Sequence, residues 1–127
     1  MNIQTTNKSL NKIIDELIIL FRKKEFNFLI KKAKEKIKEF PESFELYNLI
    51  GITFAEIKNI KQSIKYYKKA LTVNPKNFIS DFYLGSLYHD NGDLINALKH
   101  YKKSTNLNPK YTNAWFNLGV AYYENNN

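Results

Sequence analysis

One spacing recurs along this chain and constrains its fold more than any other feature. Three of the four glycines and all three prolines follow it, each 34 residues from the next: Gly51, Gly85 and Gly119, and Pro41, Pro75 and Pro109. Glycine frees a backbone and proline restricts it, so their shared period indicates a repeated structural unit. Periods of this size are typical of stacked supersecondary elements.

Apolar residues recur at steps of three and four along most of the chain, which predicts amphipathic helices. Ser43 is a predicted N-cap, and Asn91-Gly92-Asp93 has the composition of a turn. Phe40-Pro41 is expected to end a helix, because proline disfavours helical geometry in the residue before it. The expected helices cover residues 9–24, 26–40, 44–57, 61–73, 78–90 and 94–107, and a last one begins near residue 112.

The composition is that of a globular chain, with 127 residues, 43% of them hydrophobic, and no cysteine. The absence of cysteine excludes disulfides and thiolate chemistry and fits a reducing compartment. The apolar stretch at residues 13–21 is interrupted by Asp15 and Glu16, which argues against a signal peptide or a membrane span. A cytoplasmic protein is therefore expected.

The residues on the 34-residue period carry a family resemblance. The first unit has Tyr47, Ile50-Gly51, Phe54, Ser63, Tyr67, Ala70 and Pro75; the second has Asp81, Leu84-Gly85, Tyr88, Ala97, Tyr101, Ser104 and Pro109; an incomplete third has Trp115, Leu118-Gly119 and Tyr122. This pattern resembles the tetratricopeptide repeat (TPR) family. The resemblance implies an all-α, right-handed α-solenoid of antiparallel helix pairs with about seven helices. Asp81 departs from the pattern, since an aromatic or apolar residue is usual there.

The expected organisation follows from this register. Residues 1–8 are expected to be disordered or frayed, and residues 9–43 to form a degenerate helical hairpin that caps the stack. Two full repeats follow at 44–77 and 78–111, and residues 112–127 form the first helix of an incomplete repeat.

Glycine inside a helix costs about 1 kcal/mol relative to alanine, so Gly51 and Gly85 need a packing reason. The close approach of the second helix of each pair supplies one, and small Ser63 and Ala97 are expected to face these glycines.

In the family that the chain resembles, the first helix of each pair lines a concave groove that binds a partner. The residues proposed for that groove by position in the repeat are Asn48, Ile52, Phe82, Ser86, His89, Phe116 and Tyr123. Chaperone-binding members use a clamp of Lys, Asn and Arg for a peptide C-terminus, and only Asn48 offers such a side chain here. The aromatic residues favour an extended or helical segment that carries its own apolar side chains.

Catalytic, cofactor and metal sites are not expected. His89 and His100 are eleven residues apart, with no carboxylate or cysteine at a spacing that completes a metal site, so a structural or solvated role is favoured. The sequence has no glycine-rich phosphate loop. A protein interaction module rather than an enzyme is the resulting prediction.

Two alternatives remain open. The last helix has no following partner for Trp115, Leu118 and Tyr122, so the chain could be part of a longer array, a leader of a glycosyltransferase or sulfotransferase domain, or a self-associating protein. The net charge of +8 also allows weak nucleic-acid or anion binding by a lysine-rich convex face. Nineteen of the twenty basic residues are lysine, however, and a solvated lysine face needs no ligand.

Overall fold

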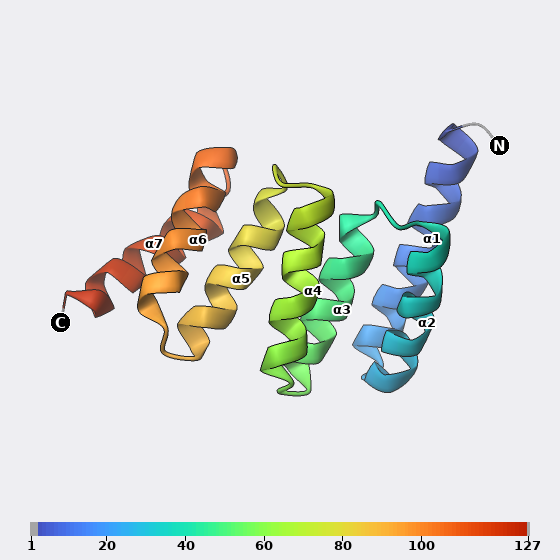
Figure 1. Ribbon diagram of the computed structural model, residues 1–127, viewed down its shortest axis with the longest axis horizontal. Coiled ribbons are helices and arrows are strands. Elements are labelled where there is room, and N and C mark those ends of the chain that lie inside the picture. The colour runs from blue at the N-terminus through green and yellow to red at the C-terminus, as the bar shows by residue number, and fades with distance from the viewer. Residues whose placement is uncertain (1–2, 127) are drawn as a thin grey trace. The chain divides into compact units, whose positions relative to one another are not determined.

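The computed structural model describes residues 3–126, and over this range the chain is all-α, with seven helices and no strand. This confirms the predicted fold class. Figure 1 shows the helices in chain order: α1 (Ile3–Arg22), α2 (Phe26–Glu39), α3 (Phe44–Glu56), α4 (Ile60–Val73), α5 (Phe78–Asp90), α6 (Leu94–Leu107) and α7 (Thr112–Asn125). The chain divides into two compact units, the first ending at Tyr66 and the second beginning at Tyr67, both within α4. The handedness of the solenoid stays a prediction.

The helix bounds agree closely with the sequence pattern except at the N-terminus. Helices α5 and α6 have the predicted bounds, whereas α1 begins at Ile3 and not at Ser9. Residues 3–8 are therefore helical where a disordered or frayed segment was expected, and residues 1–2 lie outside the described range. No glycine or proline interrupts residues 3–8, so the hydrogen-bonded ladder of the amphipathic helix continues through them.

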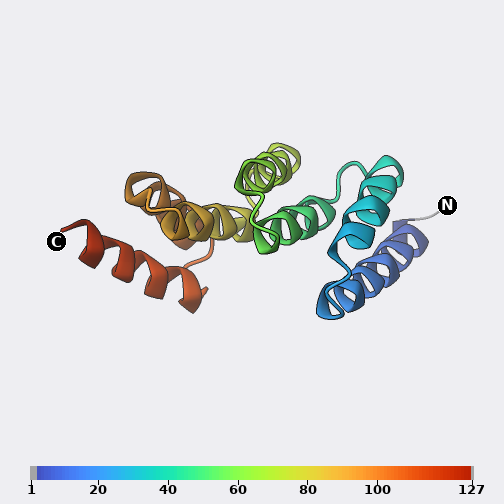
Figure 2. The ribbon, with the colours of Figure 1, turned by 90° about the horizontal axis from the view of Figure 1, so that it is seen from below.

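The core of the first unit joins α1, α2, α3 and the first half of α4. In Figures 1 and 2, α1 and α2 lie side by side as an antiparallel hairpin. The buried side chains of this core are Ile13, Leu17, Leu29, Ile30, Ala33, Leu46, Ile50, Phe54 and Tyr66. Ser63 packs on α3 as expected, because its hydroxyl donates to the carbonyl of Gly51 at 2.7 Å.

The core of the second unit is built by α5, α6 and α7, and α6 packs against both of the others. Its buried members are Ala97, Leu98, Tyr101, Leu118 and Ala121. Tyr67 and Ala70, from the end of α4, are also buried, and the Tyr67 ring stacks on that of Tyr83 with centroids 5.6 Å apart.

Gly85 lies against the ring of Tyr101. A Cβ built on Gly85 would lie 2.6 Å from Cδ1 of Tyr101, so the tyrosine ring occupies the space that a side chain would need. Gly119 has the same position one period later, and its Cβ would meet nothing within 4 Å. The two glycines therefore differ in what surrounds them.

The turn inside each helix pair repeats the same backbone conformation. Lys24, Lys58 and Gly92 are spaced by the sequence period and have φ angles of 61°, 64° and 82°. In each turn the next residue donates its N–H to a carbonyl five residues back, as in Glu25 to Leu20 at 3.0 Å and Asp93 to Tyr88 at 2.9 Å. This left-handed residue followed by a long backbone hydrogen bond is a common helix C-cap.

Helices α3 and α5 begin at side-chain caps. The Ser43 hydroxyl accepts from the N–H of Leu46 at 3.3 Å, as predicted, and the Asn77 side chain accepts from Ser80 at 2.8 Å. Tyr111 is the N-cap residue of α7, and its side chain makes no capping hydrogen bond. Its ring instead packs on Phe78 and Phe82, each with centroids 5.1 Å apart, so aromatic packing replaces capping here.

Candidate partner-binding site

The outer surface of α7 carries the most exposed aromatic residues among those proposed for the groove. Phe116 is 70% exposed and Tyr123 is 72% exposed. A shallow, mainly apolar hollow on this helix is lined by Trp115, Phe116, Gly119, Val120 and Tyr123. Covering large exposed apolar side chains with a partner lowers the free energy, so this surface is suited to binding an apolar side chain.

Phe82 lies elsewhere, in an aromatic cluster within the second unit. It is half-buried, with its ring edge-on to Tyr111 at 5.1 Å and tilted against Tyr101 at 6.1 Å. Its ring also contacts that of Tyr83 at 5.9 Å. Phe82 therefore supports the fold of this unit and offers a partner less surface than Phe116.

Ser86 and His89 meet at the hydroxyl of the buried Tyr101. The hydroxyl donates to Oγ of Ser86 at 3.4 Å and lies 3.3 Å from Nδ1 of His89. On its other side, the His89 ring places Nε2 2.7 Å from Oε2 of Glu124 on α7. The two predicted groove residues thus belong to a hydrogen-bonded chain that links α5, α6 and α7.

Burial raises the pKa of Tyr101 above its ordinary value, because the phenolate would lose its hydration. Hydrogen bonding with Ser86 and Asn117 lowers this pKa, while the carboxylates of Asp90 and Glu124 raise it. The hydroxyl therefore stays protonated at neutral pH and can act as the donor in this chain.

The two groove residues predicted in the first unit are less accessible than those on α7. Asn48 is 5% exposed, and Ile52 is half-buried on the same helix, α3. Most of the available surface within the proposed set therefore belongs to α7.

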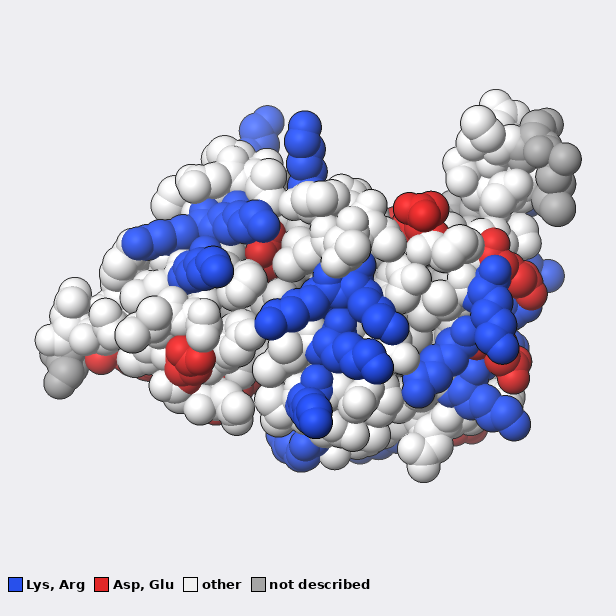
Figure 3. All heavy atoms as spheres, in the orientation of Figure 1, with Lys and Arg blue, Asp and Glu red and all other residues white. Residues whose placement is uncertain are grey.

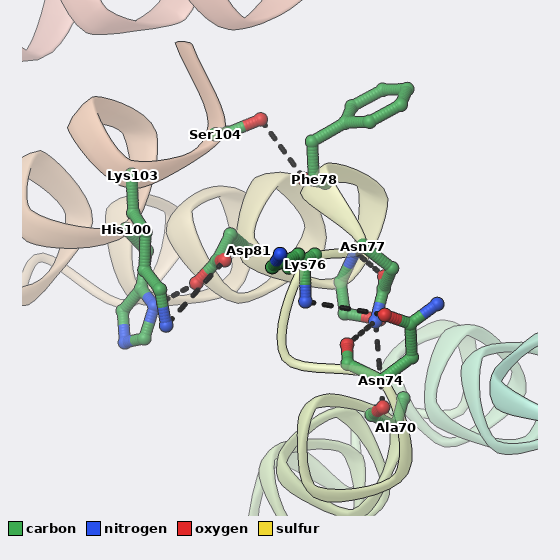
Figure 4. Close-up of polar contacts among 10 residues, drawn as sticks. Ala70, Asn74, Lys76, Asn77, Phe78, Asp81, His100, Lys103 and Ser104 are labelled. Carbon is green, nitrogen blue, oxygen red and sulfur yellow. Dashed lines mark hydrogen bonds and ion pairs between the residues drawn. The ribbon is translucent and has the colours of Figure 1, made fainter. Parts of the chain in front are cut away.

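Asp81 forms a buried polar cluster that the sequence did not reveal. Its side chain is fully buried on α5, with Oδ1 3.0 Å from Nδ1 of His100 and Oδ2 3.9 Å from Nζ of Lys103 (Figure 4). The His100 ring stacks on Tyr88 with centroids 5.6 Å apart. The only signal in the sequence was the departure of Asp81 from the repeat pattern.

Figure 4 also shows how the polypeptide is held at the start of α5. Nδ2 of Asn77 donates to the carbonyl of Asn74 at 2.6 Å and lies 3.4 Å from that of Ala70, while Ser104 donates to the carbonyl of Phe78 at 2.9 Å. These contacts tie α5 to the end of α4 and to α6.

Formal charge is divided by helix in the two full repeats and α7. Helices α3, α5 and α7 carry five carboxylates and no lysine or arginine. Helices α4 and α6 carry seven lysines and no carboxylate. Figure 3 shows one group of lysines over α4 and another over α6. The net charge of +8 for the whole chain does not reveal this division.

Neither a metal centre nor a membrane span is found in the described part of the chain. Residues 3–126 contain no group of three His, Cys, Asp or Glu side chains placed to hold a metal ion. Within the same range, no helix is both long and apolar enough to cross a bilayer.

Sequence comparison identifies the repeats. A family model described as tetratricopeptide repeat matches residues 44–77, and one described as TPR repeat matches residues 85–126. A TPR repeat-containing protein of Borreliella burgdorferi (strain ATCC 35210 / DSM 4680 / CIP 102532 / B31) is 35% identical over 61 residues. That match covers 46% of this chain, and the chain spans only about a quarter (26%) of the relative's length.

Solved structures share the fold at low sequence identity. A crystal structure of MamA has a TM-score of 0.81 at 19% identity, covering 97% of this chain and 72% of that one. The first TPR of Spaghetti (RPAP3), solved bound to the HSP90 peptide SRMEEVD, has a TM-score of 0.82 at 14% identity, covering 91% of each chain. With the two repeat models matched and the all-α hairpins in place, the chain belongs to the tetratricopeptide repeat family.

Proposed function

We propose that this chain is a non-catalytic, cytoplasmic module that binds a segment of a partner protein on its first-helix surfaces. The observation that carries the proposal is the pair of exposed aromatic side chains on α7, Phe116 and Tyr123, beside an apolar hollow. The full proposed set is Asn48, Ile52, Phe82, Ser86, His89, Phe116 and Tyr123.

Two kinds of support favour a protein partner. One structural neighbour was solved with a bound peptide, and another is the complex of Naa15/Naa10 with HypK-THB. Aromatic side chains are also enriched at the centres of protein interfaces, where a few of them account for most of the binding free energy. Phe116 and Tyr123 are the anchors that this surface offers.

Phe116→Ala and Tyr123→Ala test the proposal best, because both side chains are exposed and their loss leaves the core intact. Ile95→Ala is the matched control: Ile95 is 77% exposed but lies on α6. Tagged wild-type protein and the three variants are used to capture proteins from cell extract, followed by mass spectrometry and a direct affinity measurement on the partner found. The α7 variants should lose a partner that Ile95→Ala retains. Equal retention by all variants contradicts the proposal.

A second candidate is that another helix covers α7, either in a longer form of the protein or in a second copy. Gly119 has open space where Gly85 meets the Tyr101 ring, and Trp115 and Tyr122 are exposed at positions that form packing contacts in repeats. Sedimentation velocity over a concentration series tests the self-association form. A concentration-dependent dimer that Trp115→Ala abolishes supports it, and a monomer at all concentrations contradicts it.

A further inference from the structure

We propose that the α5–α7 surface of the second unit selects a basic partner segment, one in which lysine or arginine side chains stand beside apolar ones. This inference rests on the proposed function and specifies the chemistry of the partner. It differs from recognition of an acidic peptide C-terminus, for which the sequence offers no basic clamp on these helices.

The lysine, arginine and carboxylate side chains that α5 and α7 themselves carry are all of one sign. Helices α5 and α7 contain no lysine or arginine. Of their three carboxylates, Asp81 is buried and paired with His100, which leaves Asp90 and Glu124 at the surface. Glu124 contacts His89, which directly precedes Asp90 in the chain, so the two carboxylates lie near the same end of α5. Two carboxylates with no neighbouring cation on these helices attract a basic segment.

Glu124 is held in position and still accessible. Its Oε2 lies 2.7 Å from Nε2 of His89, and His89 in turn contacts the buried hydroxyl of Tyr101. The Glu124 side chain remains 46% exposed. A carboxylate accepts several hydrogen bonds, so pairing with His89 leaves it able to accept another from an ammonium or guanidinium group. Because the contact with His89 fixes its rotamer, less conformational entropy is lost on binding.

The aromatic residues of α7 suit the same partner. A cation over an aromatic ring is attracted by the ring's electron density, and the aliphatic stem of lysine or arginine packs on the same ring. The helix already takes part in one such contact, since Nζ of Lys102 lies 5.1 Å from the centroid of Tyr122. Phe116 and Tyr123, whose rings are more exposed, are available for equivalent contacts with a partner.

The lysines of α6 strengthen the discrimination. Lys99, Lys102 and Lys103 give this helix three positive charges and no compensating carboxylate of its own. An acidic segment is therefore drawn to α6 and repelled by Asp90 and Glu124, whereas a basic segment experiences the opposite forces. Opposed charges on the helices of one unit give specificity by repulsion as well as attraction.

Two synthetic peptides test the inference. One repeats the unit Lys-Leu-Lys-Tyr, and its matched partner has glutamate in place of every lysine. Affinity for the whole chain is measured by fluorescence anisotropy, with wild-type protein, the double variant Asp90→Asn/Glu124→Gln, and the single variant Phe116→Ala. Glu56→Gln is the control, since it removes an exposed carboxylate from α3, in the other unit.

The lysine peptide should bind the wild-type protein more tightly than the glutamate peptide does. Its affinity should fall about tenfold in Asp90→Asn/Glu124→Gln and in Phe116→Ala, and stay unchanged in Glu56→Gln. Amide chemical shifts should move on α5 and α7 when the peptide is added.

Two results would overturn the inference. In the first, the glutamate peptide binds as well as the lysine peptide, and Phe116→Ala weakens both. The surface then binds protein segments without this charge preference, and the proposed function holds without the inference. If the lysine peptide does not bind, or binds with an affinity that the carboxylate variant leaves unchanged, the charge preference is absent. The proposed function is decided separately, by the capture experiment with Phe116→Ala and Tyr123→Ala.

Discussion

The buried carboxylate of Asp81 accepts a hydrogen bond from Nδ1 of His100 at 3.0 Å, which joins α5 to α6. The residues 34 positions before and after Asp81 are Tyr47 and Trp115, and both are hydrogen-bond donors. The hydroxyl of Tyr47 donates to the carbonyl of Pro41 at 3.1 Å, and the indole N–H of Trp115 donates to that of Pro109 at 2.8 Å. A carboxylate cannot donate such a hydrogen bond. In the second repeat, Asp81 at this position instead accepts one from His100 on the next helix.

His100→Ala should destabilise the second unit by about 3 kcal/mol, because it leaves a charge buried without its closest partner. The carboxylate would keep its longer contact with Lys103, whose Nζ lies 3.9 Å from Oδ2. Urea unfolding followed by circular dichroism measures the change.

The double variant Asp81→Leu/His100→Leu is the informative control, since it removes both polar partners. Replacing a buried pair by apolar residues of similar size is often close to neutral. The double variant should therefore be more stable than His100→Ala. A double variant that is less stable would show that packing, and not the unpaired carboxylate, determines the effect.

The helices were predictable because glycine, proline and the three- and four-residue spacing of apolar residues depend on the local backbone conformation. The turn at Asn91-Gly92-Asp93 was evident from composition, whereas Lys24 and Lys58 hold the same left-handed conformation without a glycine to mark it. Only their place on the period relates them to Gly92. The local sequence therefore predicted where each helix ends, but it did not predict which turn residues adopt a positive φ angle.

The candidate site was less predictable, because periodicity assigns a residue to a face and not to a side-chain partner. His89 and Glu124 are 35 residues apart, and their contact depends on how α5 packs on α7. Phe82 and Phe116 occupy equivalent positions, yet Phe82 packs among Tyr83, Tyr101 and Tyr111, whereas Phe116 is 70% exposed. Such differences come from neighbouring helices.

Lys58→Gly should stabilise the first unit by roughly 0.5–1 kcal/mol. A non-glycine residue at φ 64° has a steric cost of about 1–2 kcal/mol, which is partly offset because glycine loses more entropy on folding. Lys65→Gly, at an exposed position in the interior of α4, is the control and should destabilise by about 1 kcal/mol. Thermal unfolding of both variants checks the opposite signs, and equal destabilisation would contradict the prediction.

The fold should lose stability in alkali through its buried tyrosines. Burial raises the pKa of Tyr83, with a further contribution from Tyr111, and burial likewise raises that of Tyr101. A phenol whose pKa is higher in the folded state contributes stability that is fully present below its unfolded pKa, near 10. That contribution is lost as the pH rises through the folded pKa.

Tyr83→Phe removes one of these groups, so the decline in unfolding free energy above pH 10 should be shallower than in the wild type. Denaturant titrations at a series of alkaline pH values measure the slope. Tyr123→Phe, at an exposed ring, is the control and should leave the slope unchanged. A wild-type stability that stays constant through this range would contradict the assignment.

Gly85→Ala and Gly119→Ala should change stability in opposite directions, although both glycines occupy the same place in their repeats. A methyl group on Gly85 would lie 2.6 Å from Cδ1 and 2.7 Å from Cε1 of the buried Tyr101 ring, so ring or helix must move. Overpacking of this kind costs about 1–3 kcal/mol. Gly119 has nothing within 4 Å, so alanine there keeps only its higher helix propensity and should stabilise by about 1 kcal/mol. Thermal unfolding of the two variants in the same buffer measures both effects. Destabilisation by Gly119→Ala would mean that another helix covers this side of α7 in solution, and recovery of stability in Gly85→Ala/Tyr101→Leu would identify the ring as the source of the clash.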